Sequence, residues 1–211
     1  TFYGVWDWQD AFDTQKKQRY LGEFTATEST PSLSNPPADA DSLTLLQQTA
    51  TAAGSGWRTF SNNAISYFTP GDPDADTDTD HAGWYFNLID SRARVIRDPS
   101  VRSGSGGDLA IVDFISSVPS ESPCDAGGHS WLYRLSACNG GRTYGPQFDT
   151  NADAKVDQSD DASKGGKSFN EMIYTPTSIG DKDYITDSTG NINEESTAQR
   201  PEGMSYWRVI Q

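Results

Sequence analysis

The chain has 211 residues, a formal net charge of −14, a mean hydropathy of −0.68, and 11% aromatic residues. Such an acidic chain repels phosphates, which excludes nucleic acid as an expected partner, and its aromatic content argues against an acidic disordered chain. Its longest apolar run is far shorter than the ~20 residues of a membrane-spanning helix, so we expect no membrane span.

Eight short segments are rich in β-branched and aromatic residues and are bounded by Gly, Pro, Asn or Asp, which is typical of strands. The predicted strands are Phe2–Trp6, Leu43–Ala50, Gly83–Leu88, Ala93–Arg97, Leu109–Ser116, Ser130–Leu135, Phe169–Tyr174 and Met204–Ile210. The most helix-like stretch, Asp10–Tyr20, has a poor apolar stripe. We therefore predict an all-β fold in which residues 1–211 form a single region. Because the chain begins at Thr1 rather than Met, we expect a mature protein or a piece of a longer one.

Polar segments interrupt these strands and are predicted to be loops. Glu28–Asp41 carries three prolines, Thr69–His81 is rich in aspartate, and Ser178–Pro201 has few large apolar residues. Strict alternation of aspartate in the second segment covers Asp72, Asp74, Asp76, Asp78 and Asp80. This run fits a second calcium loop or a self-repelling linker, and the sequence leaves both interpretations open.

The two cysteines, Cys124 and Cys138, flank a segment that we interpret as part of a hairpin, with Asn139-Gly140 as a strong turn signal. A disulfide between them would close a loop of ~15 residues and stabilise the fold by roughly 3 kcal/mol. It would also require an oxidising compartment. Two buried free thiols are the alternative. A metal site at these cysteines is disfavoured, because there is no C-x-x-C pair and the chain has only two histidines.

The most specific chemical pattern is DTNADAKVDQSD, which runs from Asp149 to Asp160. Side-chain oxygens recur at positions 1, 3, 5, 9 and 12 of an EF-hand-type calcium loop, and position 7 supplies a backbone carbonyl. Calcium prefers 6–8 hard oxygen ligands, so we expect calcium as the bound metal. The candidate metal ligands are Asp149, Asn151, Asp153, Lys155 (through its carbonyl), Asp157 and Asp160.

Two positions depart from the EF-hand pattern. Position 6 is Ala154 where glycine usually makes the turn, and position 12 is Asp160 where a glutamate usually binds through both oxygens. Both differences predict weaker binding or another loop geometry. The flanking sequence predicts no helices, so we expect a calcium loop outside an EF-hand domain. A solvated acidic turn is the alternative interpretation.

Catalytic motifs are incomplete in this sequence. The run GGKS at Gly165–Ser168 resembles the end of a phosphate-binding loop, but Asp161 occupies the position of the first glycine, so a flexible turn is the better interpretation. The run from Gly128 to Leu132 lacks the last glycine of a G-x-S-x-G elbow. We therefore expect a protein that is not an enzyme, and a secreted hydrolase is the least favoured alternative.

Several segments follow one another in a specific order: GWYFNL, ARVIRDP, a P…C…GG-S segment, and FDTNADAKVD. The segments FYGVWD, LLQQT, WRTFSNN and SYWRVIQ extend this order toward both ends. In order and spacing they resemble the C-terminal part of the PilY family, also called PilC-type proteins, which are type IV pilus biogenesis factors and tip-associated adhesins. The resemblance covers most of the chain, with insertions at about 8–40, 70–81 and 178–201.

The resemblance implies a modified β-propeller with a calcium site in a loop between strands, and it carries the ligands over to Asp149, Asn151, Asp153, Lys155 and Asp157. A whole propeller needs well over ~300 residues, so we expect a partial or reduced one. The resemblance also implies export through the periplasm to the cell surface. The expected partners are a pilin, minor pilins or the protein's own missing N-terminal region, and a host or surface receptor for an adhesin.

A second interpretation is a secreted, calcium-stabilised β-module with a dockerin-like loop that binds protein or carbohydrate. A surface subunit of an extracellular filament is a further form of it. A dockerin would carry two such loops flanked by helices, and the sequence holds one convincing loop.

Overall fold

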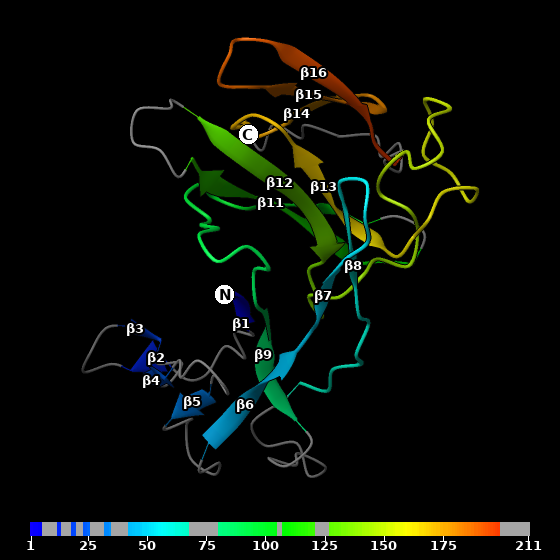
Figure 1. The fold of residues 1–211 in the computed structure, drawn as a ribbon. Coiled ribbons are helices and arrows are strands. Elements are labelled where there is room, and N and C mark those ends of the chain that lie inside the picture. Colours follow the sequence, from blue (N-terminus) through cyan, green and yellow to red (C-terminus); the bar gives the residue numbers. More distant parts are fainter. Residues whose placement is uncertain are drawn as a thin grey trace, which may run out of the picture.

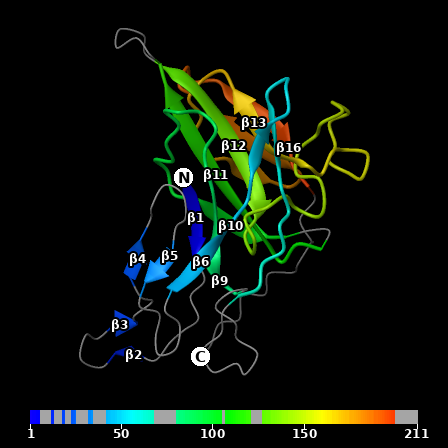
Figure 2. The same cartoon turned by 60° about the horizontal axis from the view of Figure 1, so that its bottom comes forward.

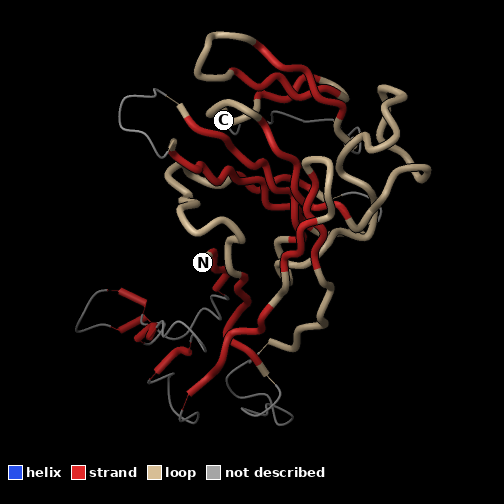
Figure 3. Tube along the Cα trace, viewed as in Figure 1, coloured by secondary structure: helices blue, strands red, loops and turns tan. Residues whose placement is uncertain are grey.

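The computed structural model describes residues 1–5, 12–13, 18–19, 23–25, 32–34, 42–67, 80–104, 107–120 and 127–198. Every regular element within these ranges is a β-strand (Figure 3). The predicted all-β class is therefore confirmed. In this part of the chain, no helix is long and apolar enough to cross a membrane.

The strands form three main sheets and a short hairpin (Figure 1). The first sheet has the order β1 (Phe2–Val5), β9 (His81–Phe86), β6 (Ser42–Gln47), β5 (Ser32–Ser34) and β4 (Glu23–Thr25). The second has the order β10 (Ser100–Ser103), β11 (Ala110–Pro119), β12 (Gly128–Ser136), β13 (Lys164–Phe169), β8 (Trp57–Phe60) and β7 (Ala50–Ala52). The third contains β14 (Thr177–Ile179), β15 (Lys182–Thr186) and β16 (Ile192–Ser196), and the hairpin pairs β2 (Phe12–Asp13) with β3 (Gln18–Arg19).

Strand direction distinguishes the first sheet from the other two. Its strand β6 runs parallel to β9, whereas every other described pair is antiparallel. None of the described sheets closes into a barrel. Open sheets joined by long polar loops are consistent with the partial or reduced propeller that we expect from the sequence.

The second sheet is the middle layer of the molecule, between the first and third sheets (Figures 1 and 2). Because side chains alternate along a strand, β12 sends Tyr133 and Leu135 into one core and Leu132 into another. The first core also contains Trp84 and Phe86 of β9, and the second contains Ile185 of β15. The alternation predicted for Ser130–Leu135 is thus confirmed, but the face that carries Ser130 and Arg134 is buried as well.

Trp84 lies between two glycines in the first core. A Cβ atom at Gly4 would lie 2.3 Å from the indole, and one at Gly140 would lie 2.0 Å from it. Gly140 also has a φ of +68°, and it ends the turn that follows β12, with its N–H donating to the Ser136 carbonyl at 2.8 Å. The predicted turn at Asn139-Gly140 therefore exists, but it does not lead straight into a hairpin, because the paired strand β13 begins only at Lys164.

Two predicted strands are wrong. Within Ala93–Arg97, only Arg94 pairs, as an isolated bridge to Ser117. Beyond Phe169, the last residue of β13, the predicted strand Phe169–Tyr174 makes only a bridge between Ile173 and Asp187. Both segments follow strands or turns closely, and their apolar residues fill core space from irregular backbone. The predicted strand Met204–Ile210 lies outside the described residues.

Three predicted loops or turns contain strands instead. Gly165–Ser168, predicted to be a flexible turn, lies inside β13 and pairs with β12 and β8. The described part of Ser178–Pro201 holds most of the third sheet. Within Glu28–Asp41, Ser32–Ser34 forms β5. These strands are polar or glycine-rich because they are short or lie close to large side chains of their neighbours.

Candidate calcium-binding loop

The candidate loop Asp149–Asp160 leaves the second core directly after Phe148, which is 1% exposed. Gln147, one residue earlier, is fully buried. Its backbone carbonyl accepts a hydrogen bond from Nη1 of Arg134 at 2.6 Å, and its Oε1 accepts one from Nη2 of Arg102 at 3.0 Å. Two arginines of the second sheet therefore fix the start of the loop.

The same arginines belong to a buried charge cluster between the second and third sheets. Arg134 of β12 donates to Asp183 of β15, and Nε of Arg102 donates to Asp113 of β11 at 2.9 Å. Burial raises the pKa of the Asp113 carboxyl, against the opposing effect of the two arginines. Sequence reasoning missed this cluster, because no local pattern marks an isolated arginine in a strand as buried.

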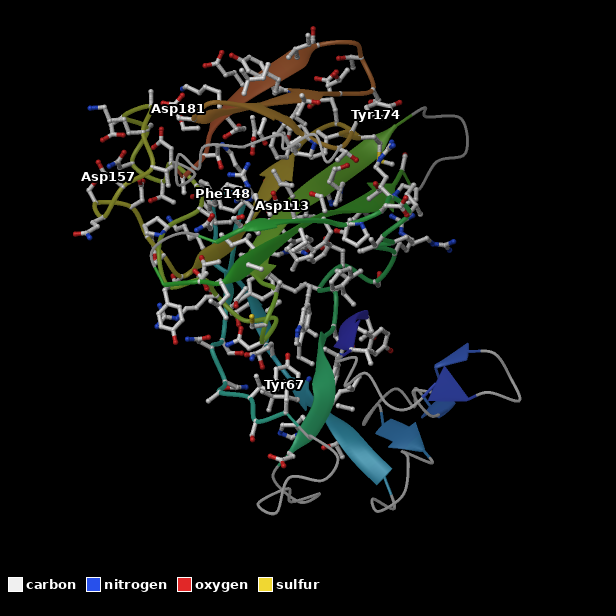
Figure 4. The ribbon with its side chains drawn as sticks, turned by 180° about the vertical axis from the view of Figure 1, so that it is seen from behind. Tyr67, Asp113, Phe148, Asp157, Tyr174 and Asp181 are labelled. Atoms are coloured by element: carbon white, nitrogen blue, oxygen red, sulfur yellow. The ribbon has the colours of Figure 1, made fainter. Side chains whose placement is uncertain are left out.

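Within the loop, the predicted ligands at positions 1, 3 and 5 wrap the backbone around themselves (Figure 4). Asp149 accepts hydrogen bonds from the N–H of Ala152 at 2.6 Å and of Ala154 at 2.8 Å. Asn151 Oδ1 accepts from the N–H of Asp153 at 3.0 Å, and Asp153 Oδ1 accepts from that of Lys155 at 3.0 Å. Short Asp and Asn side chains favour such turns because they bond to backbone two residues on.

The turn at position 6 forms without the glycine that the pattern usually has. Ala154 has a φ of +67°, and Ala152, two residues earlier, has a φ of +65°. This left-handed conformation costs an L-residue roughly 1–2 kcal/mol, because Cβ approaches the following carbonyl. The loop therefore takes a tightly wound shape, and the departure at Ala154 appears as backbone strain.

Asp160, the predicted ligand at position 12, closes the loop. Its side chain is buried, and Oδ1 accepts from the N–H of Thr150 at 2.6 Å, from the Thr150 hydroxyl at 3.0 Å and from the N–H of Asn151 at 3.3 Å. Its Oδ2 accepts from the N–H of Asp157 at 3.0 Å. In this arrangement Asp160 holds both ends of the loop together through its own hydrogen bonds.

Asp157, the predicted ligand at position 9, is exposed and firmly ionised. Its Oδ1 accepts from the hydroxyl and the N–H of Ser159, at 2.7 Å and 2.8 Å. These hydrogen bonds, the hydroxyl first, hold the pKa of Asp157 below its usual value. Ser159 also accepts from the Asn151 amide at 2.8 Å, which links positions 3 and 9. Ser159 and Thr150 are loop-shaping residues that the ligand pattern alone does not single out.

The donor set fits calcium in chemistry. Three carboxylates, one amide oxygen and the Lys155 carbonyl are all hard oxygen ligands. Among the described residues, no three His, Cys, Asp or Glu side chains are grouped so as to hold a metal ion. The carboxylates of Asp149, Asp153 and Asp157 instead accept hydrogen bonds from the loop itself. Calcium binding would require these three carboxylates to turn toward one centre.

The middle of the loop is tied to the third sheet. Ser196 at the end of β16 donates to the backbone carbonyl of Ala154 at 2.9 Å, and Nζ of Lys182 donates to the Ser196 hydroxyl at 3.0 Å. The loop is therefore anchored at its start by the second sheet and in its middle by the third. Sequence reasoning missed Ser196 and Lys182, because both lie in a segment predicted to be a loop.

The other predicted sites fall partly outside the described residues. For the second calcium candidate, Asp72, Asp74, Asp76 and Asp78 lie outside them, and Asp80 is buried. Cys124 lies outside them too, whereas Cys138 is exposed and carries a free thiol. Cys138 follows the far end of β12, a nine-residue strand about 26 Å long, from the end that Cys124 precedes. A disulfide needs Cα atoms within about 7 Å, so the pairing stays a prediction.

No family model and no curated protein matches the chain. Among solved structures, the crystal structure of the Pseudomonas aeruginosa PilY1 C-terminal domain aligns with it at a TM-score of 0.49 and 15% sequence identity. The alignment covers 90% of this chain and 47% of that one, so the chain spans about half the length of that structure. Its title names the family that the sequence motifs resemble.

Proposed function

We propose that this protein is a non-enzymatic, calcium-binding component of a type IV pilus or a related surface filament, acting in pilus biogenesis or tip adhesion. The order and spacing of its sequence motifs support the pilus assignment. The observation that carries the calcium assignment is the winding of residues 149–160. Successive Asp and Asn turns and two left-handed alanines give this acidic segment a closed, calcium-loop-like path.

In this proposal the ligands are Asp149, Asn151, Asp153, the Lys155 carbonyl and Asp157. Calcium supplies the positive charge that lets three crowded carboxylates face one another. Asp160 keeps the loop ends joined through its hydrogen bonds to Thr150 and Asp157. The mechanism is structural, because a loop with one fixed shape presents or docks a surface that a repelling loop does not.

The expected location is extracellular, at the cell surface and in association with pili, after export through the periplasm. The expected partners are a pilin, minor pilins or the protein's own N-terminal region, with a host or surface receptor in adhesion. The contact of Ser196 with Ala154 offers a route by which a change in the loop reaches the third sheet.

Thermal unfolding with added calcium and with excess chelator tests the calcium assignment. We expect calcium to raise the melting temperature, and we expect Asp149→Ala to abolish the response. Asp98→Ala, which removes an exposed aspartate outside the loop, is the matched control and should respond like the parent chain. An unchanged melt in chelator and in calcium would rule the assignment out.

Co-purification with pilin tests the pilus assignment separately. We expect the chain to be recovered with pilin or minor pilins from cells that express both. Recovery without pilin, together with an intact calcium response, would instead favour the secreted calcium-stabilised β-module. Turnover of a glycan or peptide substrate would contradict both and indicate a hydrolase.

A further inference from the structure

A cavity of about 230 Å³ lies between the candidate loop and the third sheet. Lys155, Val156 and Asp157 line it from the loop, and Asp181, Ser196 and Thr197 line it from the sheet. Figure 4 shows Asp157 and Asp181 on the same side of the molecule, one on the loop and one in the turn between β14 and β15. The cavity is distinct from the centre that the predicted calcium ligands would share.

Hydrogen bonds fix both walls of this cavity. Ser196 donates to the Ala154 carbonyl at 2.9 Å, which joins the sheet wall to the loop wall. The N–H of Thr197 donates to the Asp181 carbonyl at 2.9 Å, which joins the end of β16 to the turn before β15. The cavity is therefore bounded by segments that are held relative to each other, as a pre-formed site requires.

The charges around the cavity select the kind of ligand. Asp157 and Asp181 are acceptors on opposite walls, and Lys155 is a donor beside Asp157. A cationic ligand would meet the Lys155 ammonium, and an anionic ligand would meet two carboxylates. A neutral ligand with several hydroxyls can donate to the carboxylates and accept from the ammonium, and Val156 offers an apolar surface for its C–H groups.

A buried hydroxyl at the sheet wall supports the same choice. Thr197 is 2% exposed, and its Oγ1 is buried without a hydrogen-bond partner in the described part of the chain. A buried polar atom without a partner is costly, so such atoms usually mark a missing ligand or water. A hydroxyl of a bound ligand would satisfy Thr197 while its other hydroxyls reach Asp181 and Asp157.

We propose that this cavity binds one neutral, sugar-sized polyhydroxyl ligand, such as a terminal monosaccharide of a glycan. The volume is below the roughly 300–1,000 Å³ of drug-sized sites, so a single ring is the appropriate size. So small a ligand binds weakly, with a Kd of about 1 mM or higher. This inference depends neither on calcium binding nor on pilus association.

Amide NMR titration of the full chain tests the proposal. The probes are glucose, galactose, mannose and N-acetylglucosamine, each added separately in the presence of chelator so that calcium plays no part. We expect at least one of them to give saturable shifts at the amides of Lys155, Asp157, Asp181 and Thr197. Methylammonium and acetate, the charged probes, should give no saturable shifts there.

Two variants test the roles of the wall residues. Thr197→Val keeps the shape of the side chain but removes Oγ1, and it should raise the Kd about three- to tenfold, the effect of losing one hydrogen bond. Asp181→Asn, at an exposed position, should weaken binding without loss of folding. Thr177→Val, an exposed substitution on β14, is the matched control and should bind like the parent.

The proposal is overturned if none of the four sugars gives saturable shifts at these amides. It is also overturned if a charged probe binds there in place of the sugars, or if a folded Thr197→Val binds as tightly as the parent. Since all titrations contain chelator, failure of the calcium assignment leaves this outcome unchanged.

Discussion

Arg134 and Asp183 form an ion pair that joins the second sheet to the third, and their side chains are 0% and 2% exposed. Removing one partner of such a pair leaves a charge buried without compensation. We therefore expect Arg134→Met to lower the free energy of unfolding by about 3–5 kcal/mol. Urea unfolding followed by far-ultraviolet circular dichroism measures the loss.

The double variant Arg134→Met/Asp183→Leu distinguishes buried charge from lost packing. Because it removes both charges, it should recover most of the stability that Arg134→Met loses. Glu194→Gln is the surface control: Glu194 pairs with Lys182 at 3.4 Å and is 53% exposed, so its loss should cost less than about 1 kcal/mol. A double variant as unstable as the single one would contradict this account.

Asp187 in the turn between β15 and β16 should make stability depend on acidic pH. Hydrogen bonds hold its pKa below its usual value, that from the Thr189 hydroxyl first, at 2.6 Å, with the N–H groups of Thr189 and Asn191 assisting. The ionised form therefore stabilises the fold above the unfolded pKa of about 3.9, and this contribution is lost as pH falls through the folded value.

A pH series of urea unfolding curves checks this expectation. The stability difference between the parent and Asp187→Asn should be constant at neutral pH and should shrink below about pH 3.9. Thr189→Val removes the main hydrogen bond and should move the loss of stability toward higher pH. A difference that stays constant down to the acid transition would show that Asp187 does not titrate as described.

Glycine at position 154 should stabilise the loop. Ala154 has a φ of +67°, which glycine adopts without steric cost. Ala154→Gly should therefore raise the free energy of unfolding by up to about 1 kcal/mol. Ala64→Gly is the control, at an exposed loop position outside the residues with positive φ, and it should be neutral or slightly destabilising. Loss of stability in Ala154→Gly would contradict the strain at this turn.

Cys138 gives a direct test of the compartment argument. Its thiol is exposed, so we expect native, unreduced protein to react completely with a maleimide at this residue. Peptide mass analysis after digestion locates the label, and Cys138→Ser is the control. Protection that disappears only after reduction would establish the disulfide with Cys124 that the sequence predicts.

Hydrophobic alternation predicts the middle of this fold well. The strands β11 and β12 consist largely of β-branched and aromatic residues, and their predicted ranges match closely. β13 has the sequence KGGKSF, which is more typical of a turn. Its glycines are required because a Cβ at Gly165 would lie 2.7 Å from Leu135 and one at Gly166 would lie 3.0 Å from Tyr133. Such a requirement comes from neighbouring strands and has no local signal.

The candidate loop is the part of the site that sequence describes best. Short-range Asp and Asn turns depend on residues two to five positions apart, so a spacing pattern captures them. The contacts that anchor the loop join it to distant segments, such as Ala154 to Ser196 and Gln147 to Arg134. These contacts depend on how the sheets stack, and the spacing pattern holds no information about stacking.

The central position of β12 has a consequence for how mutations are tolerated. Since both of its faces are covered, a library of single substitutions should find little tolerance at any position from Leu132 to Ser136. In β15 the burial alternates, so substitutions should be accepted at Tyr184 and refused at Asp183 and Ile185. Sequence drift in this protein would therefore collect on the outer sheets and leave its middle layer almost unchanged.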